Sequence, residues 1–177
     1  DKPAFEFKSI SMKLLGANIK KENIETYEKV DEYYNFYYPH CQQGVTFVNG
    51  HKKILIKSIY EGIDWLIYSN GEMGLKYDFI VHPKADLSLV KMEYFNIDKI
   101  SVSENNEKII IDAGNFLLVE GALISYEQGS GKKINTKYNL SKNTITFSSE
   151  AYNKEEILVI DPPLLWGTYY GGAGSLQ

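Results

Sequence analysis

The clearest pattern in the chain is an alternation of apolar and polar residues on both sides of a turn signal, between residues 58 and 83. A period of two is typical of a β-strand with one buried face. The apolar positions of the first run are Ile63, Trp65 and Ile67, and those of the second are Leu75, Tyr77, Phe79 and Val81. Ser69-Asn70-Gly71 separates the runs, and Asn and Gly accept the positive φ of a tight turn. The segment therefore predicts a β-hairpin whose apolar positions share one core-facing side.

Short strands and turn signals fill most of the remaining sequence. Residues 5–15 indicate a strand, and residues 19–30 indicate a loop with one helical turn. Asn49-Gly50 predicts a tight hairpin turn between residues 45–48 and 51–59. Further strands are predicted at residues 90–95, with 97–102 continuing past a kink, and then at 108–112, 116–120, 122–128, 134–140, 144–148 and 157–160.

This succession of strands without a convincing amphipathic helix predicts an all-β, antiparallel fold. We expect a β-sandwich built from successive hairpins, with a closed barrel as the second choice. The length of 177 residues suits one domain, and 44% hydrophobic residues support a full core. We expect that domain to cover residues 1–165, with residues 166–177 forming a linker or the first strand of a following domain.

Charge and composition exclude several classes of function. A net charge of −4 without a basic stripe argues against nucleic-acid binding. The apolar runs are far shorter than the roughly 20 residues of a transmembrane helix. Cys41 is the single cysteine, so no internal disulfide can form.

Catalytic motifs are also missing from the sequence. The segment Gly129-Ser130-Gly131-Lys132 lacks the residues and the strand-to-helix context of a phosphate-binding loop. The three histidines lack zinc-site spacing, and His40 and Cys41 are chain neighbours that point to opposite faces of an extended chain. We therefore expect a protein that is not an enzyme and that carries no cofactor.

Fourteen tyrosines raise the question of a ligand surface. The densest group is Tyr33, Tyr34, Tyr37 and Tyr38, which surround Phe36 and precede Pro39. Such a cluster is more often a corner of the core than an exposed platform, and we favour the core corner. The alternative is a carbohydrate-binding surface that uses these four tyrosines and Trp65 as sugar platforms. It requires at least two exposed, coplanar rings on one surface.

Asp64 and Asp78 lie on the two strands of the central hairpin, and its register decides their chemistry. If Trp65 lies opposite Tyr77, the two carboxylates face each other and require a shared proton or a cation, most simply calcium. If Trp65 lies opposite Phe79, Asp64 faces Ile80 and Asp78 faces Leu66, and each carboxylate is free to accept hydrogen bonds. We favour the second register, because no further acid lies close in sequence to complete a calcium site.

The same region carries a resemblance to a known family. The residues concerned are Tyr60-Glu61-Gly62-Ile63-Asp64, Tyr68-Ser69-Asn70, residues 76–81, Pro83 and Ala85-Asp86, with Gly16-Ala17-Asn18, Asn35-Phe36-Tyr37, Tyr126-Glu127-Gln128 and Val159-Ile160-Asp161-Pro162 elsewhere. Together they resemble the uncharacterised all-β domain that precedes SBBP-type β-propeller repeats in secreted bacterial proteins, chiefly of Bacteroidota. Residues 166–174 resemble the opening strand of the first propeller repeat.

The resemblance implies a non-catalytic structural or interaction module that is secreted or displayed on the cell surface. It implies a following β-propeller in the same chain as a partner. A glycan, which the aromatic residues suggest, and a cell-surface protein are further candidates. A carbohydrate-binding module is the first alternative function. An extracellular hydrolase is the least expected, because it requires a nucleophile and a base, or two acids, converging in a cleft.

Overall fold

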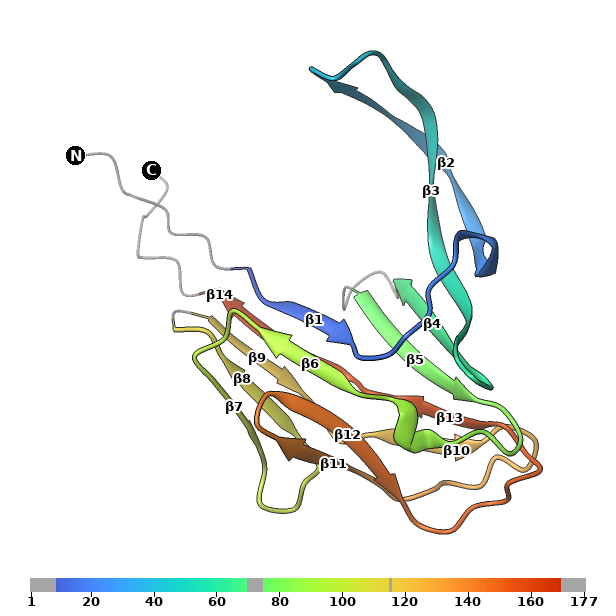
Figure 1. The fold of residues 1–177 in the computed structure, drawn as a ribbon, viewed down its shortest axis with the longest axis vertical. Helices are drawn as coiled ribbons and strands as arrows, with labels where there is room; N and C mark the ends of the chain where they lie inside the picture. The colour runs from blue at the N-terminus through green and yellow to red at the C-terminus, as the bar shows by residue number, and fades with distance from the viewer. Residues whose placement is uncertain (1–8, 70–74, 115, 170–177) are drawn as a thin grey trace.

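The computed structural model describes residues 9–69, 75–114 and 116–169, which form three antiparallel sheets and two single 3-10 turns (Figure 1). The protein is all-β, as predicted, and the described strands close no barrel. The arrangement is consistent with a β-sandwich. No helix among the described residues is long and apolar enough to cross a membrane.

The largest sheet has six strands in the order β10-β13-β5-β4-β3-β2. Its members are β2 (Ile24–Tyr38), β3 (Cys41–Tyr60), β4 (Ile63–Ser69), β5 (Leu75–Val81), β10 (Ile124–Glu127) and β13 (Leu158–Asp161). The short strands β4 and β5 lie in its centre. Strands β2 and β3 are much longer, and they leave the body together as a projecting ribbon (Figure 1).

Two four-stranded sheets complete the body. The first has the order β1-β6-β12-β11 and contains β1 (Ser11–Leu14), β6 (Met92–Phe95), β11 (Thr136–Ser141) and β12 (Thr144–Ser149). The second has the order β14-β9-β8-β7 and contains β7 (Lys99–Val102), β8 (Ile109–Asp112), β9 (Phe116–Glu120) and β14 (Leu164–Tyr169). The 3-10 turns are η1 (Lys21–Asn23) and η2 (Leu87–Leu89).

The core lies between the sheets, as the alternation in the central hairpin predicts. Ile63, Phe79 and Val81 are completely buried. The ring of Phe79 contacts that of Phe147 from β12 at a centroid distance of 5.7 Å, which joins the six-stranded sheet to the first four-stranded sheet. Leu75 was assigned to the same face, but it is 64% exposed, because it lies at the outer end of β5.

The turn predicted at Asn49-Gly50 is wrong, because β3 passes straight through it. Asn49 pairs with Tyr33 of β2, and the ribbon turns instead at Pro39 and His40. A Cβ on Gly50 would lie 2.7 Å from Cγ2 of Val30. This glycine therefore serves a close approach between two strands, which in the sequence is indistinguishable from a turn.

Other differences from the sequence-based strands follow from the sheet topology. Residues 97–102 do not continue β6; Asn96 adopts a positive φ of 58°, and β7 joins another sheet. The predicted helical turn is η1, but residues 24–30 belong to β2.

The expected turn at Asp86 is confirmed, since its carboxylate accepts the Ser88 N–H at 2.9 Å. Strand β14 pairs with β9 at the edge of its sheet, so the expected boundary after residue 165 falls inside a strand.

Candidate functional site: the projecting β2–β3 arm

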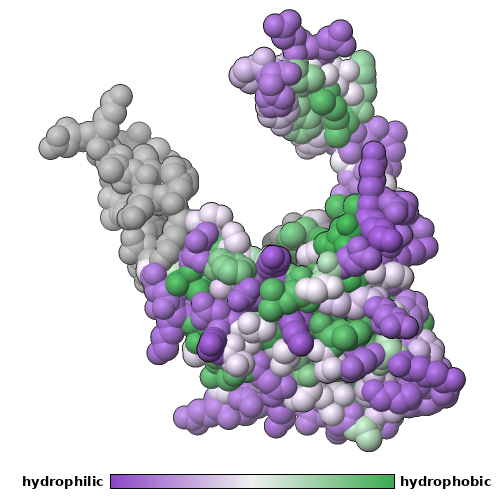
Figure 2. Space-filling model, viewed as in Figure 1, coloured by the Kyte–Doolittle hydropathy of each residue, from purple (hydrophilic) through white to green (hydrophobic). Residues whose placement is uncertain are grey.

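The most unusual surface of the protein is the part of the β2–β3 ribbon that extends beyond the sheet, residues 29–52, which we call the arm. Strand β4 pairs with β3 only from Lys53 inward. Residues 33–50, the tip of the arm, contain six aromatic residues and no Asp, Glu, Lys or Arg. Figure 2 shows apolar residues exposed near the end of the arm, between polar residues of its extremity and of its base. The tip is therefore an uncharged, aromatic surface held away from the body.

One face of the tip carries a row of nearly parallel rings. Phe36 and Tyr38 lie 6.4 Å apart with an interplanar angle of 5°, and Tyr34 lies 6.4 Å from Phe36 at 30°. His40 continues the row, 5.4 Å from Tyr38. Val45, directly opposite Phe36 on β3, lies on the same face, because residues paired across two strands point to one side. The prediction of a core corner at this cluster is wrong, since every residue from 31 to 40 is exposed.

The opposite face of the tip is also aromatic. The rings of Tyr33 and Phe47 lie 5.0 Å apart, and Tyr37 and Phe47 are each 69% exposed. Phe47 has a positive φ of 57°, and its N–H donates to Oδ1 of Asn35 at 2.9 Å. A Cβ on Gly44 would lie 2.7 Å from the ring of Tyr37, so the ring rests on bare backbone. Bulges in β3 thus let large rings lie over a thin ribbon.

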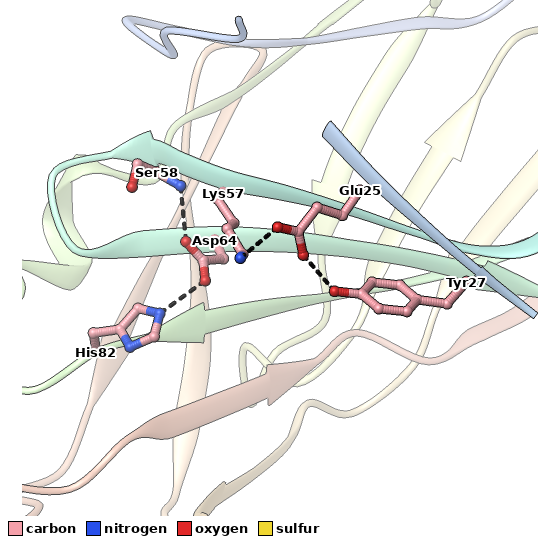
Figure 3. A network of polar contacts seen from close by, with 6 residues as sticks. All are labelled: Glu25, Tyr27, Lys57, Ser58, Asp64 and His82. Atoms are coloured by element: carbon pink, nitrogen blue, oxygen red, sulfur yellow. Dashed lines mark hydrogen bonds and ion pairs between the residues drawn. The ribbon is translucent and has the colours of Figure 1, made fainter. Parts of the chain in front are cut away.

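Ion pairs between β2 and β3 hold the ribbon together at the base of the arm, by which we mean the adjoining residues 25–28 and 53–57. Lys57 of β3 donates to Glu25 of β2 at 2.6 Å, and the hydroxyl of Tyr27 donates to the same carboxylate (Figure 3). The hydrogen bond from Lys57 lowers the pKa of Glu25. Lys53 forms a further ion pair with Glu28. These charges satisfy one another, in contrast to the uncharged tip.

Asp64 holds a bulge of β3 at the point where the ribbon enters the core. Three residues of β3, among them Ser58 with a φ of 50°, lie between the pairs that flank Asp64. Oδ1 of Asp64 accepts the N–H of Ser58 at 2.8 Å, and Oδ2 lies 2.8 Å from Nε2 of His82 (Figure 3). At the bulge the N–H of Ser58 has no backbone acceptor in the β3–β4 pairing, and the carboxylate of Asp64 takes that place.

The favoured register of the central hairpin is confirmed. Trp65 lies opposite Phe79, Asp64 opposite Ile80 and Asp78 opposite Leu66. Asp78 accepts the hydroxyl of Tyr68 at 3.2 Å. This register removes the electrostatic reason for a cation between Asp64 and Asp78. No group of three metal-ligating side chains occurs among the described residues.

Trp65 does not belong to the aromatic surface of the arm. It packs beside the core, with its ring 6.4 Å from Phe79 and edge-on to Tyr77 at 6.2 Å. Its indole N–H is buried and has no hydrogen-bond partner among the described residues. The structure therefore brings the four predicted tyrosines together on the arm and separates Trp65 from them.

Asp78 belongs to a second polar group, on the outer face of the six-stranded sheet. Burial, and then the nearby charge of Asp161, raise the pKa of Asp78 to about 6. Lys76 donates to Oδ2 of Asp161 at 3.2 Å, while Oδ1 is buried without a partner among the described residues. Asp161 is 80 residues or more from its partners in the chain, so local spacing gave no signal for this contact.

A buried acid that the sequence did not reveal lies where the three sheets meet. Glu120 ends β9, and its carboxylate accepts the hydroxyls of Tyr77 from β5 at 3.1 Å and of Tyr94 from β6 at 3.2 Å. Burial raises the pKa of Glu120 to about 7, although both hydroxyls oppose this shift. In the sequence Glu120 follows an apolar run and precedes glycine, which is the pattern of an ordinary strand end.

The comparison with known families decides the classification. The model of a domain of unknown function, DUF7948, matches residues 1–163. The chain belongs to this family. No curated protein and no solved structure matches the chain.

Several residues that carry the sequence resemblance form one corner of this DUF7948 domain. Glu61, Gly62, Pro83 and Asp86 line a cavity of about 460 Å³. Gly62 has a φ of 68°, and a Cβ there would lie 2.8 Å from that of Ala85. Asp86 is occupied in capping η2, and this hydrogen bond lowers its pKa. The contacts at this corner are those of a tight chain reversal.

For the DUF7948 domain we expect Asp64→Ala to lower the free energy of unfolding by roughly 1–2 kcal/mol, because the N–H of Ser58 would lose its acceptor. Asp64→Asn should have a smaller effect, since Oδ1 remains. Urea unfolding of the wild type and the two variants measures these differences in the free energy of unfolding.

We also expect millimolar calcium to leave the melting temperature of the wild type unchanged. Stabilisation by calcium that disappears in Asp64→Asn would contradict this account of Asp64.

Proposed function

We propose that this domain is a non-catalytic interaction module and that the tip of the arm is its contact surface. The observation that carries the proposal is the exposure of six aromatic residues on an uncharged segment that projects from the body. Contiguous exposed apolar surface of this kind is typical of binding sites. The cross-strand ion pairs that join β2 to β3 where the ribbon leaves the body support the same function, because they hold the two strands of the arm together at its base.

A two-stranded ribbon without further packing is marginally stable in water. The tip lacks a third strand among the described residues. A partner that covers it would supply the missing contacts.

We place the domain in a secreted or cell-surface protein, ahead of a β-propeller in the same chain. The sequence resemblance described above supports this context. The absence of an enzymatic role is part of the proposal. Its support is that Asp64 and Asp86 are engaged in holding backbone N–H groups, and that Glu120 lies buried between tyrosines.

Hydrogen exchange of the intact protein tests the proposal. We expect peptides from residues 33–48 to exchange more slowly in the intact protein, in its natural secreted form, than in chain 1–177 at high dilution. A partner that covers the tip excludes water and orders the ribbon. The triple variant Tyr34→Ser, Phe36→Ser, Tyr38→Ser should lose this protection while the core strands keep theirs. Equal, fast exchange of the tip in both wild-type samples would contradict an interaction surface.

Carbohydrate binding is the second candidate, favoured by the nearly parallel, exposed rings of Phe36 and Tyr38. Sugars bind to such rings, and Asn35, Gln42 and Gln43 offer uncharged hydrogen-bonding groups on the same tip. Trp65 contributes nothing to this surface. A glycan array probed with the wild type and with the triple variant distinguishes the two functions, because only a carbohydrate module would give a signal that the variant loses.

A further inference from the structure

The outer edge of β2 along Tyr33–Tyr38 is an unpaired strand edge with regular geometry. Strand β2 is the last strand of its sheet. None of these six residues has a positive φ. The extra residues of both register shifts in the tip lie in β3, where Phe47 and Gly44 have φ values of 57° and 69°. A third register shift has its extra residues in β2, at residues 30–32, before this stretch begins. Within the tip, bulges bend the edge of β3, whereas the edge of β2 remains open to another strand.

The distribution of charge limits this open edge to the tip. Nearer the body, β2 carries five charged residues, which are Glu25, Glu28, Lys29, Asp31 and Glu32. Charges along an edge strand discourage pairing with another chain. From Tyr33 to Tyr38 there is none, and none occurs on the facing part of β3. The uncharged stretch of this edge is therefore six residues long, and it lies between the charged residues near the body and the turn at Pro39 and His40.

We propose that a second copy of this chain pairs with this edge, strand β2 against strand β2, in antiparallel orientation. The inference rests on the proposed function and specifies the partner. A two-fold axis perpendicular to the ribbon keeps the aromatic faces of both copies on the same side. With the axis at Phe36, this residue lies opposite its own copy, and Tyr34 lies opposite Tyr38 of the second copy. The ring row of Tyr34, Phe36 and Tyr38 then continues across the junction.

Self-pairing suits this edge for an electrostatic reason. In a two-fold pairing centred on Phe36, a charge at the axis would meet its own copy, and an excess of one sign along the edge would meet the same excess on the second copy. An edge without charge avoids this repulsion in a protein whose net charge is −4. Aromatic pairs across antiparallel strands are favourable, and the open N–H and C=O groups of both edges become satisfied.

The geometry of the arm permits the pairing. The arm carries the tip away from the body (Figure 1), so an antiparallel junction at Phe36 places the two bodies at opposite ends of a four-stranded ribbon. In this register the paired stretch is Tyr34–Tyr38, five residues per copy, because Tyr33 falls opposite Pro39 in the turn of the second copy. The contact is small, below the roughly 1,200 Å² of total buried area that marks stable complexes. We therefore expect a dimer that forms at high concentration and dissociates on dilution.

A charge-swap experiment tests the partner and the register together. Chain 1–177 is followed by sedimentation velocity over a range of concentrations, as wild type, Phe36→Lys, Phe36→Glu and an equal mixture of the two variants. We expect each variant alone to weaken dimerisation by at least about tenfold, because like charges lie opposite each other at the axis. The mixture should recover dimers, since Lys then lies opposite Glu.

Val45→Lys is the matched control. Val45 is exposed on the same face of the arm, but on β3, away from the proposed junction. We expect this variant to dimerise like the wild type. If it does not dimerise, the two copies contact each other through the aromatic faces of their arms, and edge pairing is overturned. A monomeric wild type at all concentrations, or a mixture that stays monomeric, would also overturn the inference. If the tip is nevertheless protected from exchange in the intact protein, the interaction module stands and its partner is another molecule.

Discussion

Raising the pH from 5 to 9 should destabilise the folded protein by about 3 kcal/mol through Glu120 alone. Glu120 is 4% exposed, and burial raises its pKa from 4.5 to about 7. The folded state therefore holds the proton more tightly than the unfolded state. The stabilisation that comes from the proton on Glu120 is complete below pH 4.5 and is lost as the pH rises through 7. Guanidinium unfolding at a series of pH values measures how the free energy of unfolding changes with pH.

Glu120→Gln is the informative variant, because an amide oxygen can still accept a hydrogen bond from Tyr77 or Tyr94 and carries no charge. We expect its stability to vary much less between pH 5 and 9, and to exceed that of the wild type at pH 9. Asp78, whose pKa is also raised, makes the stability fall with rising pH as well, but over a lower pH range. Introducing Asp78→Asn into the wild type and into Glu120→Gln separates the contributions of the two carboxyl groups. An unchanged slope in Glu120→Gln would show that Glu120 is not the titrating group.

The largest effect of a single truncation is expected at Phe79. This side chain is fully buried, and its ring lies 5.7 Å from both Tyr77 and Phe147. Phe79→Ala should lower the free energy of unfolding by about 3–5 kcal/mol, because it removes a large apolar group and leaves a cavity between two sheets. Denaturant unfolding monitored by tryptophan fluorescence suits the measurement, since Trp65 stacks on Phe79.

Leu75→Ala provides the control on the same strand. Leu75 is an apolar residue of β5 at a position of the same alternation, but it is exposed at the strand end. We expect a change within about 0.5 kcal/mol. Equal effects at Leu75 and Phe79 would mean that the core face of β5 is assigned incorrectly.

The central hairpin was predictable because two requirements acted on the same residues. Ile63 and Trp65 had to share a face with Phe79 and Val81, and facing carboxylates were unfavourable. Only one of the registers considered met both conditions, and it is the one observed. The need to bury one face and the need to keep the two carboxylates apart together determine the register of β4 against β5.

The arm was not predictable by the same argument. The aromatic residues of Tyr33–Tyr38 correctly suggest a strand, but strand propensity does not say whether a third element covers it. Asn49-Gly50 carries a strong turn signal, and only the contact between Gly50 and Val30 explains why the chain continues straight. Glu120 and its tyrosines were missed because they meet through three different sheets. Each failure concerns a contact between segments that the sequence does not bring together.

The continuity of β3 has a mechanical consequence. One strand, Cys41–Tyr60, runs from the tip of the arm to the centre of the molecule. A pull on the tip along this strand loads its pairing with β4, from Lys53 to Tyr60, in shear, so several hydrogen bonds bear the force at once. The hydrogen bond from Ser58 to Asp64 anchors the strand within that stretch. Tension on an arm that is held by a partner would therefore be transmitted along β3 to its pairing with β4 in the core.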